Sequence, residues 1–262
     1  MLDVLSNGRL EIGVGKGITA FEHLQFGHPP EEASARADDT LKLLLRAWET
    51  GIMSSEGSAF FDFVELKLPF ETVQHPYPPL WTAGNVEAAG SRGHHVIYPT
   101  EMPADLRARY EELRAASAQA PGHQSPLVTE PKIAQSQSLV IARTDEEAEQ
   151  IGRRAWGKYI DAMQQARGDV PPHLQTEMPE YTTPFAKQML LGDPIEKGML
   201  ITGNVEKVRD YYVECARRGT ANYYMLMIPF GDMSFDEVSY TLEAFATEVM
   251  PAVREASSTV AA

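Results

Sequence analysis

The segment Leu5-Ser6-Asn7-Gly8-Arg9-Leu10-Glu11-Ile12-Gly13-Val14-Gly15-Lys16-Gly17 is the most informative stretch of this 262-residue chain. It predicts a short buried strand over Leu10–Val14 that runs into a glycine-rich turn carrying one cation, Lys16. A phosphate group is bound by exposed backbone N–H groups with a positive charge nearby. The stretch therefore predicts an anion-binding loop that includes Gly15, Lys16 and Gly17.

Two familiar nucleotide-binding motifs do not fit this loop. It lacks the G-K-[ST] ending of a P-loop, and Ile18 stands where the third glycine of a G-x-G-x-x-G fingerprint would fall. The sequence therefore predicts no NAD(P)H site at this position.

The composition narrows the class of protein. Hydrophobic residues make up 43% and charged residues 23% of the chain, as in ordinary globular proteins, and the net charge is −14. An acidic chain is unsuited to nucleic acid or an anionic membrane surface. Cys215 is the only cysteine, which predicts a reducing, cytoplasmic location. We expect neither a signal peptide nor a membrane-spanning segment.

Short apolar strands alternate with amphipathic helices, a pattern that predicts parallel βαβ units. The five predicted strands are Leu10–Val14, Leu80–Ala83, His94–Tyr98, Lys132–Ala142 and Tyr223–Ile228. The predicted helices are Glu31–Thr50, Val86–Arg92, Ala104–Ala118, Glu146–Arg167, Val205–Arg218 and Phe235–Glu255. Residues 21–27 are predicted as a loop, 57–79 as an extended excursion and 168–200 as a lid or insertion. Five parallel strands suit either an open doubly wound sheet or most of a (β/α)8 barrel.

Four segments in order resemble one family, the luciferase-like flavin monooxygenases. The opening stretch, with Glu22 and Phe26-Gly27 after it, is similar to the family passage S-x-G-R-x-x-x-G-x-G-R/K-G…E…F-G. Pro78-Pro79-Leu80-Trp81-Thr82-Ala83-Gly84 resembles a P-P-hydrophobic-W-x-A strand. Thr202-Gly203-Asn204-Val205-Glu206-Lys207-Val208 resembles a G-x-P-E-x-V helix start, and Phe245-Ala246-Thr247-Glu248-Val249-Met250-Pro251 resembles F-A-x-E-V-x-P.

The resemblance implies a (β/α)8 TIM-barrel-type α/β fold that binds reduced FMN or, in one branch, the deazaflavin F420. The glycine-rich strand is the fourth in that family. The resemblance thus implies an N-terminally truncated barrel that holds about strands 4–8 and lacks strands 1–3. We expect one barrel domain over residues 1–256, with 168–200 as its lid and 257–262 as a frayed tail. The family histidine that supports oxygen chemistry would lie on the absent strands, so the catalytic residues stay unknown.

The resemblance also assigns cofactor-binding positions. Lys16, with Gly15 and Gly17 beside it, takes the place of a family arginine that contacts the flavin phosphate. Lysine is a point charge and lacks the two-pronged guanidinium fork. Ala83, Gly84, Asn85 and Val86 occupy the turn after the next strand, where family members hold the same phosphate. This turn is about three residues short, although Asn85 can donate through its side chain.

Other conspicuous residues favour ordinary structural roles. His94 and His95 are neighbours in a strand and point to opposite faces, so we expect no metal site there. Trp81 and Tyr98 are typical of barrel filling, and Cys215 of a buried, inert thiol. Met178, Met189 and Met199 favour the packing of an irregular region over the lining of a substrate tunnel.

Two classes of function compete. The first is a flavin-dependent monooxygenase acting on a small organic substrate, with reduced flavin supplied by a separate reductase. The second is a truncated, catalytically silent flavin-binding or interaction protein, or a fragment of a split or misannotated gene. A barrel without three strands would expose sheet edges, and open edges invite self-association, so a homo-oligomer is also expected.

Overall fold

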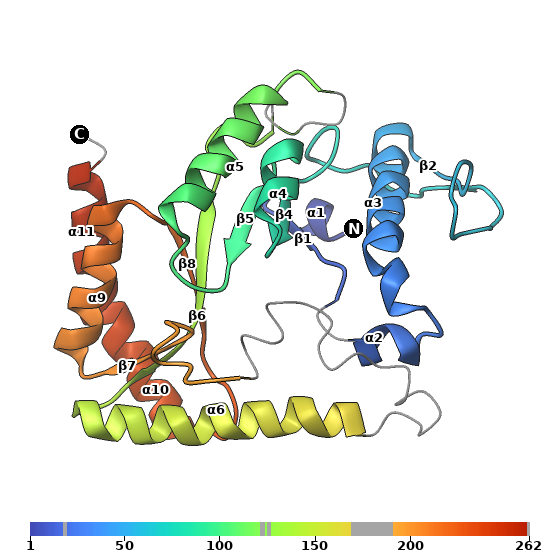
Figure 1. Cartoon of the computed structure of the whole chain (residues 1–262). Coiled ribbons are helices and arrows are strands. Elements are labelled where there is room, and N and C mark those ends of the chain that lie inside the picture. Colours follow the sequence, from blue (N-terminus) through green and yellow to red (C-terminus); the bar gives the residue numbers. More distant parts are fainter. Residues whose placement is uncertain (18–19, 121–123, 125–126, 169–190, 261–262) are drawn as a thin grey trace. The chain divides into compact units, whose positions relative to one another are not determined.

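The computed structural model describes residues 1–17, 20–120, 124, 127–168 and 191–260 (Figure 1). The chain divides into two compact units. Unit 1 contains the described residues of Met1–Val96 and Tyr110–Pro131, and unit 2 contains Ile97–Arg109 and the described residues from Lys132 onward. Both units combine helices with parallel strands, so the predicted α/β class is confirmed. The single domain expected over residues 1–256 stays a prediction.

Unit 1 carries the glycine-rich stretch. Its elements are α1 (Leu2–Leu5), β1 (Ile12–Val14), α2 (Ala20–Gln25), the 3-10 turn η1 (Pro30–Glu32), α3 (Ala33–Thr50), β2 (Ile52–Met53), β3 (Leu66–Lys67), β4 (Leu80–Ala83) and α4 (Val86–Arg92). β1 and β4 pair in parallel, whereas β2 and β3 pair antiparallel. β5 (His95–Tyr98) neighbours β4 and carries the chain from unit 1 into unit 2.

The helix ends in unit 1 lie where glycine and asparagine predicted them. Gly51 and Gly93 adopt φ of +72° and +71°, and each donates its N–H back to the helix that it ends. The side-chain oxygen of Asn85 accepts a hydrogen bond from the Ala88 N–H at 3.0 Å and so begins α4. The predicted strand Leu80–Ala83 and helix Val86–Arg92 are therefore confirmed to the residue.

Unit 2 is built around one long strand. Its elements are α5 (Ala104–Ala116, whose end lies in unit 1), β6 (Ile133–Ile141), α6 (Asp145–Gly168), β7 (Leu200–Gly203), α9 (Val205–Arg218), β8 (Tyr223–Met227), α10 (Phe235–Ala244), the π-helical turn η2 (Phe245–Val249) and α11 (Met250–Val260). β7 pairs in parallel with residues 138–141 of β6, and β8 pairs in parallel with residues 134–138. β6 is therefore the central strand of this unit.

Helices cover both faces of β6. Val140 and Ala142 pack with α6 in one core cluster, while Leu139 and Ile141 pack with α9 and α11 in another. Alternate side chains of a strand point to opposite faces, so the two clusters lie on opposite sides of β6. The closed TIM-type barrel expected from the resemblance stays a prediction.

The C-terminal helix departs from the prediction in two ways. It is interrupted by η2, in which the Met250 N–H bonds to the Phe245 carbonyl; Pro251, just beyond this turn, has no N–H to donate. The helix also runs past the predicted end at Glu255, to Val260. Leu242 is 49% exposed, whereas its neighbour Thr241 is fully buried. The Thr241 hydroxyl bonds both the N–H and the C=O of Ile141, and this contact sets the helix orientation.

Other predictions are corrected by the described residues. Residues 20–25 form α2 rather than a loop, and β7 is a strand that was not predicted, because Leu200 was placed in the lid and Thr202-Gly203 at the start of the following helix. The lid itself, over 169–190, lies outside the described residues, as do Met178 and Met189. Residues 257–260 continue α11, and the frayed tail expected over 257–262 stays a prediction. No described helix combines the length and the apolar character needed to cross a membrane.

A buried carboxylate clamps the start of the chain to the segment before β4. Asp3 is 2% exposed and accepts hydrogen bonds from the Val73 N–H at 2.6 Å, the Gln74 N–H at 3.0 Å and the Gln74 side-chain amide at 2.8 Å. Burial alone would raise the pKa of Asp3, but the hydrogen bonds from Gln74 and Val73 hold it below the usual value.

This clamp makes the stability of unit 1 dependent on pH. A carboxyl with a lowered folded-state pKa contributes stability that is fully present above the unfolded pKa of about 3.9 and is lost as the pH falls through the folded value. We expect Asp3→Asn to destabilise unit 1 at pH 7, with a difference from the wild type that shrinks below about pH 4. Urea unfolding of both proteins from pH 7 to pH 3 measures this difference in the free energy of unfolding. A difference that does not change with pH would contradict the clamp, and the exposed Asp62→Asn serves as the control.

Candidate functional site

The two predicted anion-binding loops leave neighbouring parallel strands of unit 1. β1 and β4 pair in the register Ile12↔Leu80, Gly13↔Trp81 and Val14↔Thr82. Residues 15–17 follow β1 and residues 84–86 follow β4, so both loops start at the same edge of the sheet. The carboxyl ends of parallel strands are where α/β proteins bind ligands. Parallel pairing thus brings together two segments that lie about seventy residues apart in the sequence.

The backbone of both loops is open to a ligand. Gly15, Lys16 and Gly17 are exposed, as are Gly84 and Asn85. Gly17 and Gly84 adopt φ of +85° and +72°, which only glycine reaches readily. A Cβ added to Gly15 or Gly84 would meet no atom within 4 Å, whereas one at Gly17 would come within 2.7 Å of the Glu22 carboxylate. The space at Gly15 and Gly84 and the exposed backbone donors fit an anion such as a phosphate group.

Lys16 is the cation of this site, and its position is partly set by α3. Its Nζ donates to the Ser34 hydroxyl at 3.0 Å, in the first turn of that helix. An ammonium group has three donors, so this bond leaves two for a ligand. The contact holds the charge beside the loop without consuming its capacity to bind.

Two predicted site residues have structural roles as well. The side-chain oxygen of Asn85 caps α4, so the side chain can reach a ligand only through its NH2 group. The Val86 side chain is buried at 5% exposure, which leaves its backbone N–H as the only group that could contact an anion. The turn therefore offers mainly backbone donors.

The aromatic and histidine residues beside these loops are packed into unit 1. The Trp81 indole N–H donates to the Glu11 carboxylate at 2.7 Å, and its ring lies 4.6 Å from that of His95. His94 Nδ1 lies 2.8 Å from the Thr82 hydroxyl, and both histidines are buried. Among the described residues, no three His, Cys, Asp or Glu side chains gather as metal ligands.

Unit 2 contains a pocket that the sequence analysis did not identify. Its volume is ≈ 530 Å³, and it is lined by Thr100, Glu101, Ile195, Glu196, Lys197, Gly198, Leu200, Ile201, Thr202, Lys207, Val208 and Tyr211. These residues come from the loop after β5, the turn before β7, β7 itself and α9. They carry no motif at fixed spacing, so only the folded chain could bring them together.

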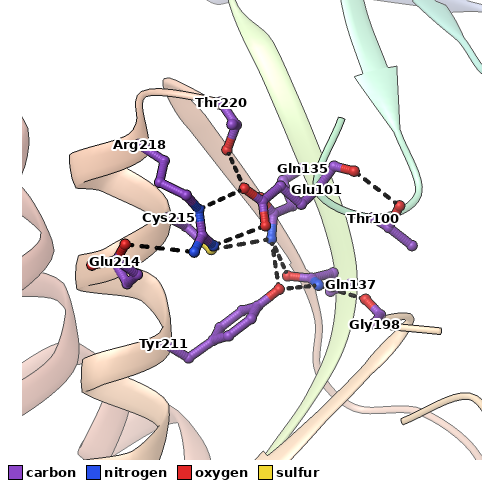
Figure 2. A network of polar contacts seen from close by, with 10 residues as sticks. All are labelled: Thr100, Glu101, Gln135, Gln137, Gly198, Tyr211, Glu214, Cys215, Arg218 and Thr220. Carbon is purple, nitrogen blue, oxygen red and sulfur yellow. Dashed lines mark hydrogen bonds and ion pairs between the residues drawn. The ribbon is translucent and has the colours of Figure 1, made fainter. Parts of the chain in front are cut away.

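A network of polar side chains lies beside this pocket (Figure 2). The Tyr211 hydroxyl accepts hydrogen bonds from the side-chain amides of Gln137 at 2.9 Å and Gln135 at 3.1 Å. Glu101 binds the Arg218 guanidinium through two bonds of 2.9 Å and accepts a third from the Thr220 hydroxyl. The network connects β6 and the loop after β5 to α9.

Burial favours the neutral forms of two ionisable groups in this network, the Tyr211 hydroxyl and the Cys215 thiol. Burial raises the pKa of Tyr211 to about 12, although the hydrogen bond from Gln137 acts to lower it. Burial also raises the pKa of the Cys215 thiol, the side chain of which is fully buried. The predicted inert character of Cys215 is consistent with this environment, because a protonated, inaccessible thiol is a poor nucleophile.

Comparison with known proteins identifies the family. The sequence profile of the luciferase-like monooxygenases matches residues 1–222. The chain belongs to the luciferase-like monooxygenase family. The resemblance inferred from the four short segments is therefore confirmed, and the glycine-rich stretch and the Trp81 strand both lie within the matched region.

Individual relatives of this luciferase-like chain are distant. An uncharacterized protein, y4wF of Sinorhizobium fredii, is 24% identical over 97% of this chain and 71% of its own length. Monooxygenase RslO1 of Streptomyces bottropensis superposes with a TM-score of 0.69 at 24% identity, over 96% of this chain and 71% of that one.

Two further solved structures differ in cofactor. The oxygenating constituent of 3,6-diketocamphane monooxygenase from Pseudomonas putida, solved with FMN, has a TM-score of 0.60 at 15% identity and covers 96% of this chain and 73% of its own. An F420-dependent secondary alcohol dehydrogenase has a TM-score of 0.59 at 18% identity. The match covers 97% of this chain and 72% of the dehydrogenase. Identities this low show a shared fold. Solved structures of this fold therefore include both an FMN enzyme and an F420 enzyme.

Proposed function

We propose that this chain is the oxygenating component of a two-component monooxygenase, which takes reduced FMN from a separate reductase and oxidises a small organic molecule with O2. Membership of the luciferase-like monooxygenase family supports this function over a catalytically silent flavin-binding protein. The diketocamphane enzyme, itself an oxygenating constituent solved with FMN, supports the two-component form. Bound reduced FMN would supply two electrons, so that one atom of O2 enters the substrate and the other leaves as water.

The parallel pairing of β1 with β4 carries this proposal. It places the loop 15–17 and the loop 83–86 at one edge of the sheet, where both present exposed backbone. The FMN phosphate would accept hydrogen bonds from the backbone N–H groups of Gly17 and Val86 and from the Lys16 ammonium. Ser34 keeps that ammonium in place through its 3.0 Å hydrogen bond.

A deazaflavin is the second candidate cofactor, because an F420-dependent dehydrogenase shares the fold. Binding measurements with each cofactor, in its reduced form, separate the two candidates. Saturable binding of F420 without binding of FMN would favour a hydride-transfer enzyme over a monooxygenase.

The phosphate anchor is tested by comparing FMN with riboflavin, which lacks the phosphate. We expect Lys16→Ala to weaken the binding of reduced FMN by about 10- to 100-fold, since a hydrogen bond to a charged group contributes about 1.5–3 kcal/mol and each 1.4 kcal/mol is tenfold. Riboflavin affinity should not change. Anaerobic titration followed by flavin fluorescence measures the dissociation constants of FMN and of riboflavin.

Lys42→Ala is the matched control, because Lys42 is an exposed lysine on α3 that lies outside both loops. This variant should bind FMN like the wild type. Equal losses of FMN and riboflavin in Lys16→Ala would remove Lys16 from the phosphate site. Failure of the wild-type chain to bind either FMN or F420 would overturn the proposed function.

A further inference from the structure

Residues 54–68 of unit 1, here called the arm, have a backbone that is held in place by specific hydrogen bonds. Arg46 of α3 donates from Nη1 to the Glu56 carbonyl at 2.9 Å. The Ser55 hydroxyl bonds both the carbonyl and the N–H of Phe63 at 3.1 Å. The Ser58 hydroxyl donates to the Asp39 carboxylate at 2.6 Å. These contacts fix the arm against α3 (Figure 1, the light blue segment that follows β2).

The side chains of the arm are nevertheless exposed. Every residue from 61 to 67 is exposed, and the apolar side chains of Val64 and Leu66 are 90% and 61% exposed. Single exposed apolar residues are common, but a run of them on a fixed backbone is typical of an interaction surface. A fixed backbone also lowers the entropy that would be lost on binding.

The arm ends in an open sheet edge. β3 pairs only with β2 in the described part of the chain, in the register Ile52↔Lys67 and Met53↔Leu66. The Leu68 N–H donates to the Gly51 carbonyl at 2.8 Å, so the backbone groups of Leu66 and Leu68 point toward β2. Backbone groups alternate in direction along an antiparallel strand. Those of Lys67 therefore point outward, to the open edge, and the same alternation continued to Glu65, just before β3, directs its backbone groups outward as well.

We propose that two copies of this chain dimerise by antiparallel pairing of these β3 edges, centred on Leu66. In this register Glu65 of one copy and Lys67 of the other exchange backbone hydrogen bonds, because these are the residues with outward-pointing groups. Leu66 lies opposite Leu66 of the second copy, and Val64 lies opposite Leu68. The two-fold symmetry repeats each of these pairs.

The charges make this edge complementary to itself. Glu65 lies opposite Lys67 of the second copy, and Lys67 lies opposite Glu65, so the dimer contains two opposite-charge cross-strand pairs. A lone lysine on an edge strand discourages pairing, but the Glu-Leu-Lys order turns the same charge into an attraction. A register centred on Glu65 instead would place two glutamates opposite each other. The sequence around the edge thus favours a second copy as the occupant, in one register.

Charge reversals test this arrangement. The wild type should sediment at twice the 29.0 kDa of one chain. Glu65→Lys and Lys67→Glu should each weaken the dimer by about tenfold, since each replaces two opposite-charge pairs with two like-charge pairs. Mixing the two variants should restore dimers, because every cross-strand pair in the mixed dimer again joins a lysine to a glutamate. Analytical ultracentrifugation over a concentration series, with one variant fluorescently labelled, measures these species.

Glu56→Lys is the matched control, since it changes the same charge on the arm away from the edge, and it should dimerise like the wild type. A monomeric wild type would overturn the proposal, as would a dimer that neither single reversal weakens. Single variants that dissociate but do not associate with each other would overturn the proposed register. None of these results depends on flavin binding, so the dimer can fail or succeed independently of the proposed function.

Discussion

Gly231→Ala is expected to destabilise unit 2 by about 2–5 kcal/mol, because a left-handed alanine costs about 1–2 kcal/mol and overpacking about 1–3. Gly231 has φ of +56° and lies against α6. A Cβ there would come within 2.6 Å of the Ala155 carbonyl carbon and would overlap its oxygen. Ala155 is fully buried in the α6 cluster, so neither backbone can move without disturbing the core.

Gly219→Ala separates the two causes of this loss. Gly219 also has a positive φ, +64°, but a Cβ there would meet nothing within 4 Å. The free energy of unfolding of Gly219→Ala should therefore fall only by the conformational cost of about 1–2 kcal/mol. Urea unfolding gives the free energies, and hydrogen exchange of α6 amides assigns the loss to unit 2. Equal losses in both variants would contradict the close approach of Gly231 to α6.

Tyr212→Ala should destabilise unit 2 by about 3–5 kcal/mol, the usual cost of removing a buried aromatic ring. Tyr212 is fully buried, and its ring makes edge contacts with Tyr211, Tyr224 and Phe245 at centroid distances of 5.0, 5.3 and 5.8 Å. Such ring pairs add to the area that the side chain buries. The cavity would open between α9 and η2, where little backbone movement could fill it.

Tyr212→Phe isolates the hydroxyl from the ring. That hydroxyl donates to Gln137 Oε1 at 3.2 Å, but the same oxygen also accepts from Gln135 at 2.7 Å. Removing it should therefore cost only about 0.5–1.5 kcal/mol. Tyr240→Ala, at a tyrosine that is 37% exposed, is the control and should cost less than Tyr212→Ala. If Tyr212→Phe lost as much unfolding free energy as Tyr212→Ala, the hydrogen bond rather than packing would dominate at this position.

Local signals predicted much of the secondary structure. Thr144 bonds the Glu147 N–H at 3.1 Å at the start of α6, and Asn204 bonds the Lys207 N–H at 2.9 Å at the start of α9. Gly219 ends α9 with a positive φ. These bonds join residues three or four apart, so their partners are visible in the sequence. β7 escaped prediction because it is only four residues long and follows a segment rich in proline, methionine and glycine.

The candidate site was predicted only in part. Gly15, Lys16 and Gly17 and the turn 83–86 were found from glycines, one cation and a family resemblance. The Lys16–Ser34 contact and the burial of Val86 were not visible, because each depends on packing against another element. The pocket beside Tyr211 left no trace in the sequence, since its lining comes from segments about one hundred residues apart.

The sequence by itself determined the helix ends, most strands, the family and the two loops that could hold a phosphate. These properties arise from backbone conformations and bonds between near neighbours in the chain. The tertiary structure decided which residues meet: the shared edge of β1 and β4, the helices on both faces of β6, the pocket of unit 2 and the open edge at Lys67 of β3. Strand pairing and helix packing join residues distant in the chain, and no local pattern encodes which distant partner is chosen.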